Sequence, residues 1–272
     1  MSSEKTQAIV VRVVDFSETS CVVTLFTREF GKIGALAKGA RRPKSPFESA
    51  LDLLAVCRIV FLHKSSESLD VLTEAKLERR FRGATRDLSR LYAGYYIAEL
   101  LRDLTHAGDP LPALYDAAEA GLQELEGNLP VHRIVLRFEM LALHLLGHLP
   151  ALFGCAACGQ SIEVSGRMLF GQQAGGLLCS RCRVGQRQVV GTTARTIEVL
   201  RRFATFGTSS WRETPMEART RGEIRGIVGQ YMCNVLDHRP RMHDYLGSLS
   251  GNVAPRAGHR DTSRERTYTG RG

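Results

Sequence analysis

Cys155-Ala-Ala-Cys158 and Cys179-Ser-Arg-Cys182 are two CxxC pairs separated by twenty residues. This spacing matches that of four-thiolate zinc sites. Two residues between cysteines let both sulfurs of one turn reach a single ion, and two such turns give tetrahedral coordination with Zn–S distances near ~2.3 Å. Because four thiolates leave no coordination position for water, the pattern predicts a structural zinc ion rather than a catalytic one.

Other interpretations of these cysteines are a pair of disulfides or a thioredoxin-type redox pair. Disulfides are disfavoured in a reducing cytosol, and the surrounding sequence does not resemble a redox βαβ unit. A zinc deaminase would need a His-x-Glu ahead of a Pro-Cys-x-x-Cys, and neither occurs here. Zinc is therefore the favoured cofactor, and its predicted ligands are Cys155, Cys158, Cys179 and Cys182.

Two histidines just ahead of this stretch form a second candidate metal pair. His144 and His148 are four residues apart and share one face of a predicted helix. An HExxH motif needs glutamate at its second position, where this chain has Leu145. The favoured interpretation is a packing or surface role, with a metallohydrolase site as the alternative.

Composition gives only broad limits on function. The chain has 272 residues and a formal net charge of +9, so an anionic partner is plausible. The segment 1–7 lacks the pattern of a signal peptide, and no run of 18 apolar residues occurs, so we expect a cytoplasmic protein. The scattered cysteines Cys21, Cys57 and Cys233 are interpreted as buried, inert thiols.

The first 80 residues contain five short apolar segments separated by glycine and polar turns. These predicted strands cover residues 7–15, 21–27, 31–38, 55–62 and 69–76. Five short strands in series indicate a small antiparallel barrel. The favoured fold is the oligonucleotide-binding OB-fold over residues 1–80, although periodicity alone does not separate it from an SH3-like barrel.

A basic loop follows the third predicted strand. Lys38-Gly39-Ala40-Arg41-Arg42-Pro43-Lys44 places four cations in seven residues, and no acid occurs between Glu29 and Glu48. Arginine forks and lysine ammonium groups suit phosphate oxygens. The predicted DNA-binding residues are Lys32, Lys38, Arg41, Arg42 and Lys44. The plain alternative is a solvated loop that happens to be basic.

Two aromatic residues flank this loop. Phe30 and Phe47 could stack on bases, but aromatic residues in such positions are more often part of a core.

From about Ala75 the hydrophobic period changes to three and four residues, which predicts helices. The expected helices run to about residue 104 and then cover 113–126, 130–148, 192–206 and 215–236. The chain is thus predicted to be a multidomain α+β protein, in which a helical domain (81–246) contains an inserted zinc ribbon at about 151–190. The segment 247–272 is rich in Gly, Ser, Arg and Thr and is predicted to be a disordered basic tail.

Several of these features occur in an order that resembles a known family. The basic loop is followed by Leu136-Arg137-Phe138-Glu139, and Leu145-Leu146-Gly147-His148-Leu149-Pro150 stands directly before the first cysteine pair. With a basic barrel, a helical bundle and a CxxC ribbon ahead of the last helices, residues 1 to about 246 are similar to the RecO family of bacterial recombination mediators.

The resemblance implies a DNA-binding function without enzymatic activity. It implies binding of single- and double-stranded DNA, strand annealing, and cooperation with RecR to load RecA onto DNA coated by single-stranded DNA-binding protein. It also implies contact with the acidic C-terminal tail of that protein, and a role in DNA recombination and DNA damage repair at the nucleoid. No GxxxxGK[ST] phosphate loop is present for an ATPase.

Three rival functions come from other classes of protein. A zinc-ribbon transcription or translation factor would bind without annealing strands. A metallohydrolase using His144 and His148 would lose turnover on chelation. A protein-binding scaffold would tolerate charge reversal at Arg41 and Arg42.

Overall fold

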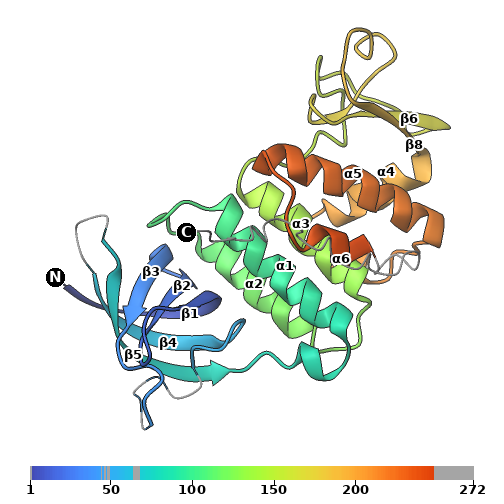
Figure 1. Ribbon diagram of the computed structural model, residues 1–272. Helices are drawn as coiled ribbons and strands as arrows, with labels where there is room; N and C mark the ends of the chain where they lie inside the picture. Colours follow the sequence, from blue (N-terminus) through green and yellow to red (C-terminus); the bar gives the residue numbers. More distant parts are fainter. Residues whose placement is uncertain (1, 44, 46, 48–49, 64–67, 248–272) are drawn as a thin grey trace, which may run out of the picture.

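The computed structural model describes residues 2–43, 45, 47, 50–63 and 68–247 (Figure 1). The predictions for Lys44 and for the tail at 248–272 lie outside these residues. A five-stranded barrel stands at one end of the molecule and a small ribbon at the other, with the helices between them. Within the described part of the chain, no helix combines the length and the apolar character needed to span a bilayer.

The five predicted strands are all present. They are β1 (Ser2–Asp15), β2 (Cys21–Thr27), β3 (Gly31–Ala37), β4 (Val56–His63) and β5 (Asp70–Arg79). They close into a barrel in the order β1-β2-β3-β5-β4. The expectation of a wholly antiparallel barrel is wrong at one position, because β3 and β5 pair in parallel.

The middle of β1 is buried on both faces, which explains the apolar run from Ala8 to Val11. Ala8 and Val10 point into the barrel core, whereas Ile9 and Val11 pack in the core of the helical domain. A bulge between Val10 and Arg12 then changes the pairing register. A strand covered on both sides loses the polar alternation of a half-exposed strand.

The helices are α1 (Leu88–Leu104), α2 (Pro112–Glu124), α3 (Val131–Leu145), α4 (Ala194–Phe203), α5 (Ala218–Leu236) and the short α6 (His243–Gly247). The predicted helix start near Ala75 is wrong. Residues up to Arg79 stay in β5 because they continue to pair with β4 as far as Val56. The helix begins after Asp87, whose side chain accepts a hydrogen bond from the Arg90 amide and caps it.

The ribbon contains β6 (Arg167–Gly171), β7 (Gly176–Leu177) and β8 (Val189–Thr193), ordered β7-β6-β8. The short apolar segments 162–164, 167–170 and 175–178 predict strands that close a ribbon. The second and third of these predictions are confirmed, but residues 162–164 form no strand. Phe170 and Leu177 join the helical core, where Phe170 packs edge-on against Tyr231 of α5. The ribbon is therefore anchored by apolar contacts at its base.

The barrel meets the helical domain at a close joint. The Lys32 carbonyl accepts a hydrogen bond from the Gly108 amide at 3.0 Å, and Lys32 bridges to Ala107 as in a parallel strand. Nearby, Arg28 forms an ion pair of 2.9 Å with Asp116 of α2. Gly31 has φ +64° and lies against the Asp109 backbone, so any side chain would overlap the Asp109 carbonyl oxygen.

Gly31→Ala is expected to destabilise the protein by about 2–4 kcal/mol, because it combines left-handed backbone strain with a clash at this joint. Gly108→Ala is the matched control. Gly108 has φ +71° but no neighbour within 4 Å, so only the backbone cost of about 1 kcal/mol applies. Urea unfolding of both variants measures the difference. Equal losses would show that the close approach to Asp109 is unimportant.

Candidate metal centre and nucleic-acid interface

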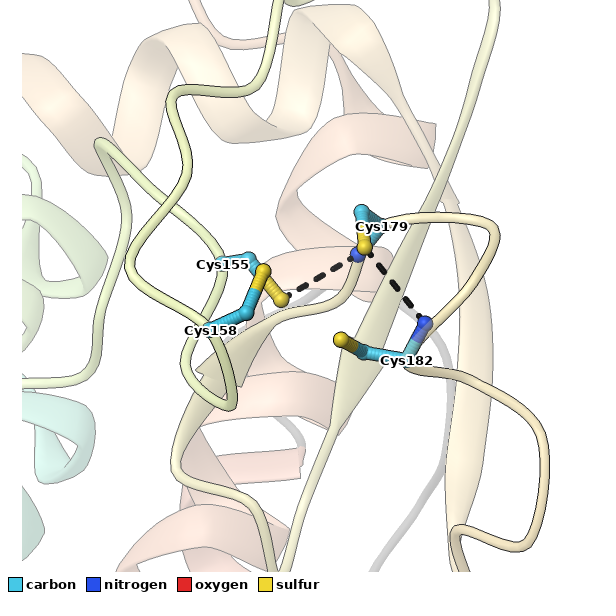
Figure 2. Close-up of side chains that lie close together, drawn as sticks. All are labelled: Cys155, Cys158, Cys179 and Cys182. Carbon is cyan, nitrogen blue, oxygen red and sulfur yellow. Dashed lines mark hydrogen bonds between the residues drawn. The ribbon is translucent and has the colours of Figure 1, made fainter.

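The four predicted metal ligands come together in the ribbon. Cys155 and Cys158 belong to one turn, Cys179 and Cys182 to another, and the two turns face each other (Figure 2). All four Sγ atoms lie within 4.8 Å of one another. Four sulfurs bound to one zinc ion at ~2.3 Å would be roughly 3.8 Å apart. The cluster is thus close to the geometry that a tetrahedral ion requires, and these residues could hold a metal ion.

Backbone hydrogen bonds shape both turns. The Cys179 amide donates to the Cys155 Sγ at 3.5 Å, and the Cys182 amide donates to the Cys179 Sγ at 3.4 Å. The amide hydrogen bond from Cys179 lowers the pKa of Cys155 to about 6. A hydrogen bond with Cys179 raises the pKa of Cys182 to about 12. The lowered pKa of Cys155 favours its thiolate, which is the form that binds a metal ion, and a bound metal would displace the protons that remain.

The competing interpretations receive no geometric support. All four cysteines are free thiols rather than disulfides. His144 stacks on Phe206 with ring centroids 4.2 Å apart, as expected for a packing role. Among the described residues, the cysteine cluster is the one group with the arrangement of a metal site, and neither His144 nor His148 belongs to it.

One carboxylate of α5 binds the end of the ribbon to the start of α4. Glu223 of α5 accepts hydrogen bonds from Thr192 Oγ1 at 3.0 Å, Thr193 N at 3.2 Å and Thr196 Oγ1 at 2.7 Å. These groups belong to the end of β8 and the first turn of α4. Burial opposes the charge, but the threonine hydrogen bonds prevail and lower the pKa of Glu223 to about 2.

This low pKa predicts a loss of stability in acid. The folded-state pKa lies below the unfolded value of about 4.3, so Glu223 contributes stability above that pH and loses it as the pH falls toward 2. Glu223→Gln is expected to cost about 2–3 kcal/mol at pH 7 and much less at pH 3. Urea unfolding of both proteins at pH 7, 4 and 3 measures the difference between their free energies of unfolding. A difference that does not change with pH would contradict the low pKa of Glu223.

The basic loop leaves β3 and lies beside the β1–β2 turn. The Arg41 amide donates to the Thr19 carbonyl at 3.1 Å, and the Gly39 amide donates to the Ser20 hydroxyl at 3.2 Å. The side chains of Lys38, Arg41 and Arg42 are all exposed. Arg41 forms an ion pair with Asp15, whereas Lys38 and Arg42 have no ion-pair partner among the described residues.

Lys32 is placed differently from the rest of the predicted set. Its ammonium group donates to the carbonyls of Arg102 and Thr105 at the C-terminal end of α1, and burial lowers its pKa. It lies at the start of β3, six residues and roughly 20 Å from Lys38. Lys32 therefore joins the barrel to the helical domain.

The two flanking aromatic residues are core residues. Phe47 is 3% exposed inside the barrel, and Phe30 packs edge-on against the buried Phe61 at 5.3 Å. The exposed aromatic near the loop is instead Phe16, which is 66% exposed at the β1–β2 turn. Its position between Asp15 and Ser17 is a signal that the sequence offers, because a large aromatic residue within a polar turn has few apolar neighbours.

Comparison with known proteins agrees with this two-part organisation. A family model described as Recombination protein O N terminal matches residues 1–81, and one described as Recombination protein O C terminal matches residues 85–243. The gap between the two matches falls between β5 and α1.

Relatives match over almost the whole chain. The DNA repair protein RecO of Rhodopirellula baltica is 40% identical over 262 residues, which cover 88% of this chain and 97% of the relative. The corresponding protein of Anaeromyxobacter dehalogenans is 31% identical, with 92% and 100% covered, and that of Moorella thermoacetica is 28% identical, with 90% and 91% covered.

The structure combines a barrel that has an exposed basic loop with a helical domain that carries a four-cysteine cluster. Together with these matches, it defines a DNA repair protein. The chain belongs to the RecO family.

Proposed function

We propose that this protein is a recombination mediator that binds single- and double-stranded DNA and anneals complementary strands. In this proposal it works with RecR to load RecA onto DNA coated by single-stranded DNA-binding protein, and it contacts the C-terminal tail of that protein. It acts in the cytoplasm at the nucleoid, through binding rather than covalent chemistry. Family membership supports the class, and the exposed Lys38, Arg41 and Arg42 support the DNA site.

The proposed division of the chain follows the architecture. The barrel is an OB-fold over residues 1–80, and its β1-β2-β3-β5-β4 closure supports this assignment. The helical domain covers residues 81–246 and includes a zinc ribbon at about 151–190. The four clustered sulfurs support a structural Zn²⁺ in that ribbon.

The mechanism follows from charge. Two DNA strands repel each other, and cations at the barrel loop lower that repulsion and raise the local concentration of both strands. The Arg41–Asp15 pair is exposed, and such pairs contribute only about 0–1 kcal/mol. A phosphate can therefore replace Asp15 as the partner of Arg41 at little cost.

The double variant Arg41→Glu/Arg42→Glu is expected to weaken DNA binding by at least tenfold and to lower the slope of log affinity against log salt by about 1.5–2. The matched control is Arg183→Glu/Arg187→Glu, which makes the same charge change on exposed ribbon residues. The assays are fluorescence anisotropy across salt and annealing of oligonucleotides coated with single-stranded DNA-binding protein.

The outcomes distinguish a DNA site on the barrel from one on the ribbon, and a mediator from a zinc-ribbon factor. Annealing lost in the loop variant and retained in the control supports the mediator with its DNA site on the barrel. Loss in the ribbon variant alone would move the site to the ribbon. If the wild type does not anneal strands, the mediator function is wrong and a zinc-ribbon factor becomes the better assignment.

A further inference from the structure

The four cysteines of the ribbon differ in their exposure to solvent. Cys155 is 3% exposed, and Cys179 and Cys182 are half-buried, whereas Cys158 is exposed. The amide hydrogen bonds that shape the two turns reach the sulfurs of Cys155 and Cys179. Cys158 is therefore the cysteine of the cluster that is most accessible to a small molecule in solution.

A second sulfur lies within reach of Cys158. Cys155 belongs to the same turn, and all four sulfurs lie within 4.8 Å of one another (Figure 2). A disulfide needs a sulfur–sulfur distance near ~2.05 Å, so a movement of less than roughly 3 Å joins the pair. Gly159, which follows Cys158, has φ +72°, and a Cβ added there would meet nothing within 4 Å. The turn therefore has room to make this movement.

The cysteine turns have little apolar packing of their own. Val184 in the second turn is 78% exposed, whereas the core residues Met168, Phe170 and Leu177 belong to the base of the ribbon. A bound ion is therefore expected to hold the two turns together. Two thiolates cannot form a four-coordinate site, so a disulfide between two ligands would release the ion and loosen both turns.

Cations surround the cluster. Arg181, Arg183 and Arg187 are exposed in the second turn, and Glu163 is the one acid between residues 151 and 190. Positive surroundings stabilise a thiolate, and reactive cysteines combine such surroundings with exposure to solvent. Cys158 has both properties, whereas a buried structural thiol has neither.

We propose that Cys158 is a site of oxidation by hydroperoxides, where one peroxide molecule converts Cys155 and Cys158 into a disulfide and the structural zinc ion is released. This inference goes beyond DNA binding and rests on the zinc ion proposed above. The change would leave the barrel and the helices folded, because the base of the ribbon keeps its apolar contacts with the helical core.

The chemistry takes two steps and uses hydrogen peroxide as the oxidant. The Cys158 sulfur attacks one peroxide oxygen, the O–O bond breaks, and the leaving hydroxide takes up a proton to become water. The Cys155 sulfur then attacks the sulfur of the resulting sulfenic acid, the S–S bond forms, and a second hydroxide leaves and is protonated to water. The two sulfurs together lose two electrons, and the peroxide gains them.

The first test identifies the cysteine that reacts first. The full-length protein, loaded with zinc, is treated with hydrogen peroxide in the presence of dimedone, which traps sulfenic acids, and its peptides are analysed by mass spectrometry. The label is expected on Cys158, and without dimedone a disulfide between Cys155 and Cys158 should take its place. Label found first on Cys179, Cys182 or Cys233 would overturn the assignment.

The second test measures zinc release with a chromogenic chelator. Histidine is also a zinc ligand but has no oxidisable thiol, so Cys158→His should release zinc in peroxide about tenfold more slowly than Cys182→His, which makes the same ligand change and keeps Cys158. Cys233→Ser, outside the cluster, should release zinc as the wild type does. Equal rates in the two histidine variants would overturn the inference. The labelling test does not depend on these substitutions.

Failure of this inference and failure of the proposed zinc ion give different results. A wild type that binds no zinc would reject the metal site itself. A wild type that binds zinc and keeps it in peroxide would reject only the oxidation of Cys158. Hydrogen exchange gives a further readout, because oxidation should speed exchange in the cysteine turns while β6 stays protected. Unchanged exchange in these turns after the disulfide has formed would contradict the expected loosening.

Discussion

Glu139→Ala is expected to lower the free energy of unfolding by about 3–5 kcal/mol. Glu139 of α3 is fully buried, and its carboxylate accepts two hydrogen bonds from the Arg225 guanidinium of α5, at 2.7 and 3.1 Å. It also accepts a 2.7 Å hydrogen bond from the Tyr96 hydroxyl of α1. The substitution leaves the Arg225 charge buried without its partner, which is the costly case for an ion pair.

Burial raises the pKa of Tyr96 well above its usual value, and the Glu139 charge raises it further, so the tyrosine remains a donor throughout the physiological range. Glu139 thus joins three helices that are distant in the sequence. Replacing the whole pair, as in Glu139→Leu/Arg225→Met, should recover most of the loss, because both desolvated charges are then removed together.

The measurement is urea unfolding followed by the fluorescence of Trp211. The control is the exposed pair Arg239 and Asp244, whose side chains are 61% and 69% exposed. Asp244→Ala should cost less than about 1 kcal/mol. A loss below 1 kcal/mol in Glu139→Ala as well would mean that water or another group compensates Arg225.

Cys155→Ser/Cys179→Ser is expected to abolish metal binding and unfold the two cysteine turns. Structural zinc contributes about 10–16 kcal/mol in small zinc-binding peptides, far more than these exposed turns gain from packing. The base of the ribbon should remain folded, because Met168, Phe170 and Leu177 are part of the helical core. Local unfolding rather than loss of the domain is therefore the expected result.

Metal analysis and hydrogen exchange test this expectation. The wild type should carry one zinc ion per chain, and the variant none. Exchange should become fast around 155–160 and 179–186 while β6 stays protected. Cys233→Ser is the control, because Cys233 lies in α5 outside the cluster. Zinc retained by the double variant would show that these cysteines are not its ligands.

Local pattern accounted for much of the architecture. The five strands and two of the ribbon strands were predicted because alternation and turn residues act over a few neighbours. The helix expected from Ala75 was wrong, because the apolar spacing of Leu77 and Phe81 fits a helix whereas long-range pairing with β4 holds residues up to Arg79 in a strand.

Charge alone could not assign roles to the cations. Lys32 lies in β3 and Lys38 directly follows that strand, and the two look alike in sequence. The Lys32 side chain nevertheless ends at helix carbonyls, whereas that of Lys38 ends in solvent. Likewise, Phe47 and Phe16 differ in role because one closes the barrel core and the other stands outside it.

The sequence by itself determined the four-cysteine spacing, the barrel strands and the basic loop, because each depends on residues close together in the chain. Only the tertiary structure decided that Lys32 joins the barrel to the helices, that Glu139 pairs with Arg225, and that Phe16 stands exposed while Phe47 is buried. These outcomes depend on which elements, distant in the sequence, pack against each other. That packing, rather than the local residue pattern, decides which side chains are buried and which are paired.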